Sequence, residues 1–263
     1  MKEVFAGEIC VYDYEGSGKT LLFVHAFPFN HRMWDYQINY FNNHYRVITF
    51  DIRGFGKSKD SFYHIYTMED FSDDVLNIIE YFRLKEVNIC GLSMGGYIVQ
   101  RAVIKSTGKF SSMILADSKA ERDDDEDVIK RARFISNLKN FGKESAADNF
   151  MRRLMYKDNY ENKILYKFIK DIIDQQSVEA MCGASLAMAM RTNTIDYFKD
   201  INIPVLIMVG DNDKFTPFEY SERMKSKLKN SRLKIISNSG HLSPLENPRE
   251  FNSYLSEFLE TTI

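Results

Sequence analysis

Short apolar runs rich in β-branched residues alternate along this chain with longer segments in which apolar residues recur at helical spacing. The runs predict strands at residues 3–13, 20–25, 45–50, 87–90, 110–116, 204–209 and 233–236. The longer segments predict helices at residues 31–42, 67–82, 94–105, 218–229 and 248–260. Because strands and helices alternate, the pattern predicts an α/β fold with a mostly parallel central sheet and helices on both faces.

The helix predicted at residues 67–82 has both a start signal and an apolar face. Thr67 and Asp70 have the spacing of a capping box, in which each side chain binds the backbone N–H of the other residue. Its apolar residues share one helical face: Met68, Phe71, Val75, Ile78, Ile79 and Phe82. We therefore expect this face to pack against the sheet.

The segment between Ser118 and Ile203 departs from the alternation of strand and helix. It contains no clear strand, and helical patterns follow one another at residues 151–155, 164–173 and 181–190. The sequence therefore predicts a core formed by residues 1–118 and 204–263, with residues 119–203 inserted as a helical unit before the strand at 204–209.

A serine lies on the predicted turn between the strand at 87–90 and the helix at 94–105. The local sequence is Gly91-Leu92-Ser93-Met94-Gly95-Gly96, which matches the G-x-S-x-G nucleophile elbow. Glycine is required on either side of Ser93 because a Cβ there would collide with the neighbouring strand or helix. The start of the helix directs free N–H groups towards an oxyanion on the substrate. Ser93 is therefore the candidate nucleophile.

A serine nucleophile needs a base, and the base needs an acid that orients it. In an elbow of this kind the order along the chain is serine, acid, histidine. Two candidate acids, Asp211 and Asp213, follow the strand at 204–209. Of the five histidines, only His241 comes after these acids and at the end of a predicted strand. His241 is therefore the candidate base.

Five ordered motifs resemble those of the α/β-hydrolase fold superfamily, in its branch of small esterases, enol-lactonases and cofactor-free haloperoxidases. Besides the elbow they are His25-Ala26-Phe27-Pro28, the loop Asp51 to Ser58, the segment Gly210 to Pro217 and the ending Ser239 to Pro248. In the segment Gly210 to Pro217 the family's acid is the fourth residue, so the resemblance implies Asp213 rather than Asp211. It also implies an oxyanion hole formed by the backbone N–H groups of Phe27 and Met94. Ala26 departs from the pattern, because family members usually carry glycine at this position.

The resemblance implies that residues 119–203 form a helical cap over the active site, which shapes the substrate pocket and excludes water. Trp34 follows the first oxyanion motif at a spacing often seen in the family. Met181 and Met188 lie at near-helical spacing in the expected cap, where a methionine either fills the core or lines the pocket. We expect Trp34, Met181 and Met188 to line the substrate pocket.

The acidic run from Asp123 to Asp127 could be mistaken for a metal site. Acids at the start of a helix cap its free N–H groups and interact favourably with its dipole. We therefore expect this run to begin the next helix and not to bind a metal.

Composition and charge restrict the functional class. The chain has 263 residues and a net charge of −2, so it shows no electrostatic footprint for nucleic acid. Its first residues lack the apolar stretch of a signal peptide, and no apolar segment is long enough to span a bilayer. Three cysteines without a C-x-x-C pair predict neither disulfides nor a zinc site. We expect a cytoplasmic protein. A homodimer is an open alternative to a monomer, because the sequence does not show whether any of its aromatic residues lie in an interface.

The function predicted from these residues is hydrolysis of a small carboxylic ester through an acyl-enzyme, as in a carboxylesterase, with no metal or organic cofactor. Enol-lactonase and C–C bond hydrolase chemistry use the same three residues and remain alternatives. An alternative of another class is a ligand-binding signalling protein that keeps these three residues but has almost no catalytic activity. Fold alone does not decide among these functions.

Overall fold

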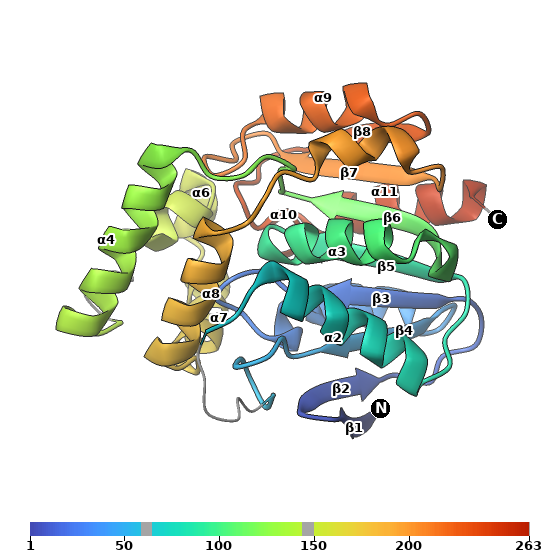
Figure 1. Cartoon of the computed structure of the whole chain (residues 1–263), viewed down its shortest axis with the longest axis horizontal. Helices are drawn as coiled ribbons and strands as arrows, with labels where there is room; N and C mark the ends of the chain where they lie inside the picture. The colour runs from blue at the N-terminus through green and yellow to red at the C-terminus, as the bar shows by residue number, and fades with distance from the viewer. Residues whose placement is uncertain (59–64, 144–149, 263) are drawn as a thin grey trace.

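One twisted sheet of eight strands forms the centre of the computed structural model, which describes residues 1–58, 65–143 and 150–262 (Figure 1). The strands lie in the order β1-β2-β4-β3-β5-β6-β7-β8. Their bounds are β1 Lys2–Ala6, β2 Ile9–Asp13, β3 Thr20–Val24, β4 Arg46–Phe50, β5 Val87–Leu92, β6 Phe110–Ala116, β7 Val205–Gly210 and β8 Ser231–Ile236. Strands β3 to β8 are parallel, whereas β2 is antiparallel to β1 and β4.

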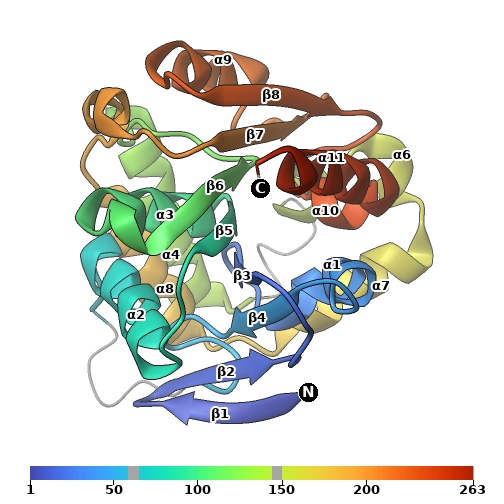
Figure 2. The same cartoon turned by 90° about the vertical axis from the view of Figure 1, so that its right-hand side faces the viewer.

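Helices cover both faces of this sheet (Figure 2). On one face lie α1 (Asp35–Phe41) and α11 (Pro248–Thr261), with the short α10 (Ser243–Glu246) beside them. On the other face lie α2 (Met68–Tyr81), α3 (Met94–Lys105) and α9 (Phe218–Lys227). The 3₁₀ turns are η1 (His31–Trp34), η2 (Thr107–Lys109) and η3 (Ile195–Asp200). The predicted α/β fold, with a mostly parallel sheet between two helical layers, is confirmed.

The start of the chain differs from the prediction of one strand over residues 3–13. It forms a hairpin of β1 and β2, in which Lys2 pairs with Asp13 and Ala6 with Ile9. The chain reverses at Gly7, whose φ of +65° lies in the left-handed region that favours glycine. The helix predicted at 31–42 also divides, because its first turn is the 3₁₀ turn η1 and α1 begins only at Asp35.

Helix α2 begins as its sequence predicts. The Thr67 hydroxyl accepts from the Asp70 N–H at 3.1 Å, and the Asp70 carboxylate accepts from the Thr67 N–H at 2.8 Å. This is a complete capping box, which satisfies two backbone donors that the first helical turn leaves without partners. The apolar face, including Phe71 and Val75, is buried.

Two apolar cores lie on opposite faces of the sheet, because neighbouring strand residues point in opposite directions. Leu22 of β3 belongs to one core, whereas Leu21 and Phe23 belong to the other. Ala184 of α8 (Val178–Ala189) packs into the first core and Ile169 of α7 (Lys163–Asp174) into the second. Residues from both cores thus hold the segment that follows β6.

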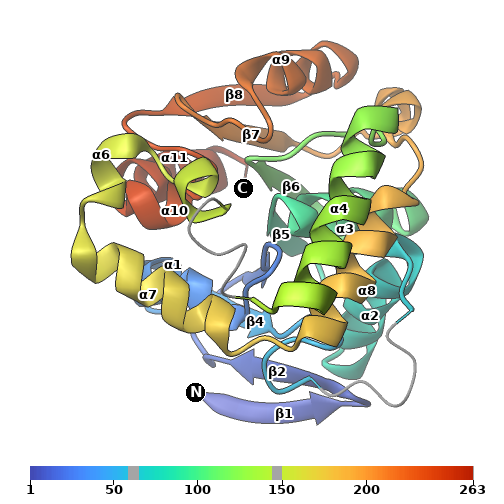
Figure 3. The same cartoon turned by 90° about the vertical axis from the view of Figure 1, so that its left-hand side faces the viewer.

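The described residues between β6 and β7 form helices and no strand. They include α4 (Asp125–Phe141), α6 (Lys157–Tyr160), α7 (Lys163–Asp174) and α8 (Val178–Ala189), and residues 150–154 are helical as well. These helices lie beyond the carboxyl ends of the parallel strands, where α4 packs beside α8 (Figure 3). We call residues 119–203 the insertion. Within the described part of the chain, no helix is long and apolar enough to cross a bilayer.

Candidate active site

Ser93 lies on a strained turn at the carboxyl end of β5, immediately before α3. Its φ of 53° and ψ of −114° are unusual for a residue with a side chain. A Cβ on Gly91 would lie 2.7 Å from the Gly96 nitrogen and closer still to the Gly95 carbonyl. A Cβ on Gly95 would lie 2.8 Å from the carbonyl oxygen of His25. Both glycines are therefore required for the strand and helix to meet this closely, as the sequence predicts.

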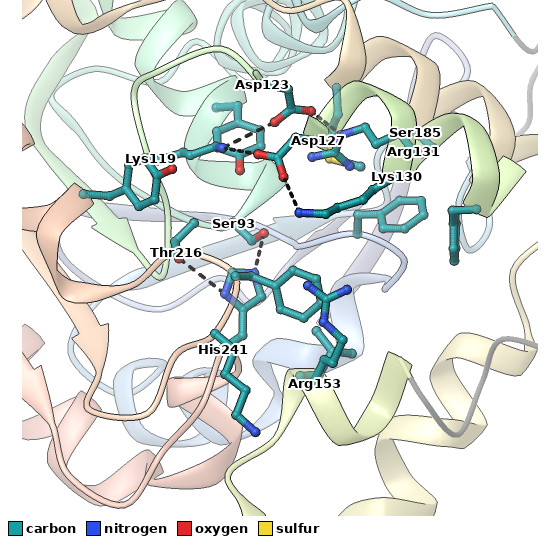
Figure 4. Close-up of a pocket in the computed structure, with 18 of the residues that line it drawn as sticks. Ser93, Lys119, Asp123, Asp127, Lys130, Arg131, Arg153, Ser185, Thr216 and His241 are labelled. Carbon is teal, nitrogen blue, oxygen red and sulfur yellow. Dashed lines mark hydrogen bonds and ion pairs between the residues drawn. The ribbon is translucent and has the colours of Figure 1, made fainter. Parts of the chain in front are cut away.

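The structure brings Ser93, His241 and Asp213 together from three loops that are distant in sequence. The Ser93 Oγ lies 2.7 Å from Nε2 of His241 (Figure 4). On the other side of the ring, Nδ1 lies 2.9 and 2.8 Å from the two carboxylate oxygens of Asp213. Because the carboxylate can only accept, Nδ1 carries a proton and Nε2 is free to accept from the serine hydroxyl.

Asp213 is held in the ionised form that this arrangement needs. Its carboxylate accepts from the N–H of Phe215 at 2.8 Å, from the N–H of Thr216 at 3.0 Å and from the Thr216 hydroxyl at 2.6 Å. Burial alone would raise the pKa of Asp213, but the charge of His241 and these hydrogen bonds lower it below its usual value. Burial in turn acts to lower the pKa of His241, and the Asp213 carboxylate more than offsets this, so the pKa is raised.

The two backbone N–H groups expected to form the oxyanion hole have no backbone acceptors among the described residues. They belong to Phe27, in the loop after β3, and to Met94, the first residue of α3. Phe27 also lines the cavity into which Ser93 opens. Ala26 is not among the residues of positive φ, so alanine fits this turn although the family pattern has glycine there.

The other strand-end histidine, His25, is bound within the core. Its Nε2 accepts from the Ile52 N–H at 2.8 Å and its Nδ1 lies 2.8 Å from the carbonyl oxygen of Ala26. Complete burial lowers the pKa of His25 to about 4, so the ring is neutral at physiological pH. With both nitrogens occupied, His25 has no free nitrogen to accept a proton from Ser93.

The rival acid Asp211 binds the loop that carries the histidine. Its two carboxylate oxygens accept from the N–H groups of Asn238 at 3.0 Å and Ser239 at 3.1 Å. Asp211 therefore holds the start of this loop, whereas Asp213 contacts the imidazole itself. This arrangement matches the assignment that the family motif implies.

Two further carboxylates near the site were given no role by sequence analysis, although one of them, Glu246, lies in the motif Ser239 to Pro248. Asp117 follows β6 and accepts from the Gly210 N–H at 2.8 Å, the Ser243 N–H at 3.1 Å and the Ser243 hydroxyl at 2.6 Å. It is completely buried, and burial together with the nearby charge of Asp213 raises its pKa to about 7. Its only sequence signal is its position at the end of a parallel strand.

Glu246 is the second of these carboxylates, and it joins the histidine loop to the insertion. It accepts from the N–H groups of Gly240 at 2.9 Å and Tyr156 at 2.7 Å. The N–H of His241 in turn donates to the carbonyl oxygen of Leu154 at 2.7 Å. The position of the candidate base thus depends on residues from the insertion as well as on the core.

Ser93 and His241 open into a cavity of about 420 Å³ between the sheet and the insertion. Phenylalanines from both parts form one wall, since Phe134 and Phe150 of the insertion contact Phe27 at centroid distances of 5.8 and 6.5 Å. Phe150 also contacts Phe215, which packs against the His241 ring at 5.0 Å. This wall is apolar and suited to a hydrocarbon or aromatic group.

Of the three residues expected to line the pocket, Met188 does so. Trp34 does not line this cavity, because its ring is fully buried between Phe23 and Phe251 on the face of the sheet that carries α11. Met181 does not line it either, because its side chain lies in the apolar core below α8. Helical spacing alone could not distinguish the cavity face from the core face of α8, because that helix is buried over most of its circumference.

The acidic run caps α4 as predicted, with one exception. Asp124 accepts from the Asp127 N–H at 2.8 Å, and the acids that follow occupy the first turn. Asp123, however, is buried and forms ion pairs with Arg191 at 2.8 Å and with Arg131. No group of three or more metal-ligating side chains occurs in the described ranges of the chain.

Comparisons with known proteins agree with this architecture. A family model described as the alpha/beta hydrolase fold matches residues 19–248. The 3-oxoadipate enol-lactonase 1 of Acinetobacter baylyi is 27% identical over 243 residues, which cover 92% of this chain and 89% of that protein. A thermophilic esterase from Thermogutta terrifontis, solved with malate bound, has a TM-score of 0.91 and 29% identity, covering 97% of this chain and 93% of that one. An esterase from Exiguobacterium antarcticum has a TM-score of 0.88 and 25% identity, covering 96% and 95%.

Proposed function

Since the chain belongs to the α/β-hydrolase fold family, we propose that it is a serine hydrolase that cleaves a small carboxylic ester through an acyl-enzyme. The observation that supports this most strongly is the contact of the Ser93 hydroxyl with Nε2 of His241 at 2.7 Å, with Asp213 bound behind the ring. The similarity to esterases and an enol-lactonase supports an ester-acting hydrolase.

In the first half-reaction Ser93 Oγ attacks the ester carbonyl carbon while its proton passes to Nε2 of His241. The carbonyl oxygen becomes an oxyanion, which the N–H groups of Phe27 and Met94 bind. Each such donor typically contributes about 10²–10³-fold to the rate. The C–O bond then breaks, and His241 returns the proton to the departing alkoxide, which leaves as the alcohol.

In the second half-reaction a water molecule attacks the acyl carbon and gives its proton to His241. The bond to Ser93 Oγ breaks, the serine regains the proton, and the carboxylic acid leaves. Asp213 remains ionised throughout, and it stabilises the imidazolium that forms in both halves. The raised pKa of His241 matches this role, because the positive ring is favoured beside the carboxylate.

The insertion acts as a cap in this proposal. It supplies Phe134, Phe150 and Met188 to the cavity, while the three catalytic residues come from the core. A cavity of about 420 Å³ suits a small substrate. We expect short acyl chains to be preferred, because the phenylalanine wall closes one side of the cavity.

The proposal is tested with p-nitrophenyl esters from acetate to decanoate and with the variant Ser93→Ala. We expect multiple turnovers that peak at short chains, and a fall of at least about 10³-fold in kcat for Ser93→Ala with unchanged thermal unfolding. Turnover by Ser93→Ala at the wild-type rate would refute the assignment of the nucleophile.

An enol-lactone is the second candidate substrate, since a relative of that activity aligns with 92% of the chain. Turnover of an enol-lactone but of no p-nitrophenyl ester would favour it. A persistent covalent adduct on Ser93 after a single slow turnover would instead favour a ligand-binding signalling protein.

A further inference from the structure

Charged side chains surround the cavity unevenly. Its lining contains the basic residues Lys119, Lys130, Arg131, Arg153 and Lys214, but only the acids Asp123, Asp124 and Asp127. The whole chain, by contrast, has a net charge of −2. The approach to Ser93 is therefore more positive than the average surface of the molecule, which favours the entry of an anion.

The basic residues on the side of α4 have acidic partners. Lys119 forms ion pairs with Asp123 at 3.4 Å and Asp127 at 3.1 Å. Lys130 pairs with Asp127 at 3.6 Å, and Arg131 pairs with Asp123. These cations and acids offset one another, so this side of the cavity has little unpaired charge to offer a substrate.

Arg153 and Lys214 are different, since neither has an acidic partner among the described residues. Figure 4 shows Arg153 beside His241, on the opposite side of Ser93 from the Lys119–Asp127 pair. Lys214 directly follows Asp213 in the loop after β7 and is exposed. Two cations without acidic partners among the described residues thus line the cavity, one from the insertion and one from the core.

The position of Arg153 relative to the reacting atoms is set by stacking. Its guanidinium lies 4.5 Å from the centroid of the Phe215 ring, which itself packs against His241. Stacking uses the face of the guanidinium and leaves its N–H edges free to donate. A planar fork of donors of this kind matches the two oxygens of a carboxylate.

We infer that Arg153 and Lys214 select substrates that carry an anionic substituent, of which a carboxylate is the simplest case. The inference rests on the proposed function, because the ester is expected to react at Ser93. An ester of this class has an apolar middle against the phenylalanine wall and a charged end at the two cations. The carboxylate can belong to the acyl part or to the alcohol part of the ester, and the experiment distinguishes these arrangements.

The test compares matched anionic and neutral esters. Monoethyl succinate is compared with ethyl pentanoate for an acyl-side charge, and 4-acetoxybutanoate with pentyl acetate for an alcohol-side charge. Acid release is followed in a pH-stat, and kcat and KM are obtained separately. We expect kcat/KM to favour the anionic ester of at least one pair by about tenfold or more, chiefly through KM, and to lose this preference as salt is added.

The double variant Arg153→Gln and Lys214→Gln removes both cations. We expect the ratio of anionic to neutral kcat/KM to fall about tenfold in this variant. The matched control is Lys229→Gln with Arg249→Gln, which removes two exposed cations that do not line the cavity. The ratio should not change in the control.

Binding to Ser93→Ala separates this inference from the proposed function, since the ester stays intact in that variant. Calorimetry with the same ester pairs should show tighter binding of an anionic ester, and the two further substitutions should abolish this difference. Selective binding without turnover by the wild type would support the anion site and refute the proposed reaction. Turnover without any preference for charge, or a preference that survives in Arg153→Gln/Lys214→Gln, would overturn the inference.

Discussion

Asp211 and Asp213 are separated by one residue, yet their side chains bind different partners. Asp213 contacts the imidazole of His241, whereas Asp211 accepts from the backbone N–H groups of Asn238 and Ser239. Spacing along the chain could not separate the two roles, and the family motif was needed to choose between them. The structure provides a physical distinction that variants can test.

We expect Asp213→Ala to lower kcat by about 10³–10⁴-fold, because the imidazole loses the partner that fixes its tautomer. Asp211→Ala should change kcat by less than tenfold and lower the free energy of unfolding by about 0.5–1.5 kcal/mol, because two backbone N–H groups at the surface lose their acceptor. Steady-state kinetics with p-nitrophenyl acetate and urea unfolding measure both effects. A larger loss of kcat in Asp211→Ala would transfer the acid role to that residue.

At the residue scale, the sequence was most informative where chemistry constrains it. Ser93 and His241 could be chosen because glycine-flanked turns and strand ends leave few alternatives, and the structure places them in contact. Trp34 and Met181 were misplaced because a large apolar side chain looks the same in sequence whether it fills a core or lines a cavity. Arg153 gave no sequence signal, because its importance depends on the Phe215 ring beneath it.

At the scale of the secondary-structure elements, the crossing of β5 and α3 depends on the absence of side chains. Gly91 of β5 faces the backbone of Gly95 and Gly96 in α3, and Gly95 in turn faces the backbone carbonyls of Val24, at the end of the neighbouring strand β3, and His25. Gly108, by contrast, has nothing within 4 Å of the place where a Cβ would stand. These two glycines therefore form a matched pair for a substitution to alanine.

We expect Gly95→Ala to lower the free energy of unfolding by about 3 kcal/mol and to displace Ser93 enough to abolish measurable turnover. Gly108→Ala should leave both the stability and the rate close to those of the wild type. Urea unfolding and p-nitrophenyl acetate hydrolysis test both variants. Equal behaviour of Gly95→Ala and Gly108→Ala would contradict the close packing described for the elbow.

Most elements could be predicted from the sequence, because apolar periodicity and capping residues are local signals. The capping box of Thr67 and Asp70 is an example in which the local signal is realised in full. The hairpin of β1 and β2 was predicted as one strand because its turn contains a single glycine, Gly7, with no proline or Asn-Gly pair to mark it. The order of strands in the sheet could not be obtained from periodicity, since it depends on contacts between distant residues.

At the scale of the whole molecule, Asp117 connects the ends of two parallel strands with the start of α10. It lies at the end of β6 and accepts from Gly210 at the end of β7 and from Ser243, two residues beyond His241. One buried carboxylate thus fixes the two loops that hold the candidate acid and base. These hydrogen bonds explain why Asp117 lies close to a second carboxylate, Asp213. Burial and the charge of Asp213 raise the pKa of Asp117 to about 7.

We expect Asp117→Asn to lower kcat at pH 8 by about tenfold and the free energy of unfolding by about 1–3 kcal/mol, since an amide cannot accept from all three donors. The Asp117 carboxylate also raises the pKa of His241, so the acidic limb of kcat/KM should move to lower pH in the variant.

Because the pKa of Asp117 is higher in the folded than in the unfolded chain, its titration favours folding below about pH 4 and loses this effect as the pH rises through about 7. Stability measured from pH 4 to 8 should therefore fall more steeply in the wild type, and parallel curves for the two proteins would contradict this.

Strands β6 and β7 are hydrogen-bonded neighbours in the sheet, although the whole insertion separates them along the chain. Doubling the length of such a connection costs only about 0.6 kcal/mol in closure entropy, so the sheet tolerates exchange of the segment it spans. Phe134, Phe150, Arg153 and Met188 all come from this one stretch, whereas Ser93, Asp213 and His241 lie outside it. In evolutionary terms, recombination at two points, one after β6 and one before β7, exchanges the substrate-facing residues in one step, and it keeps the catalytic geometry if the new segment also binds His241 and Glu246 as Leu154 and Tyr156 do.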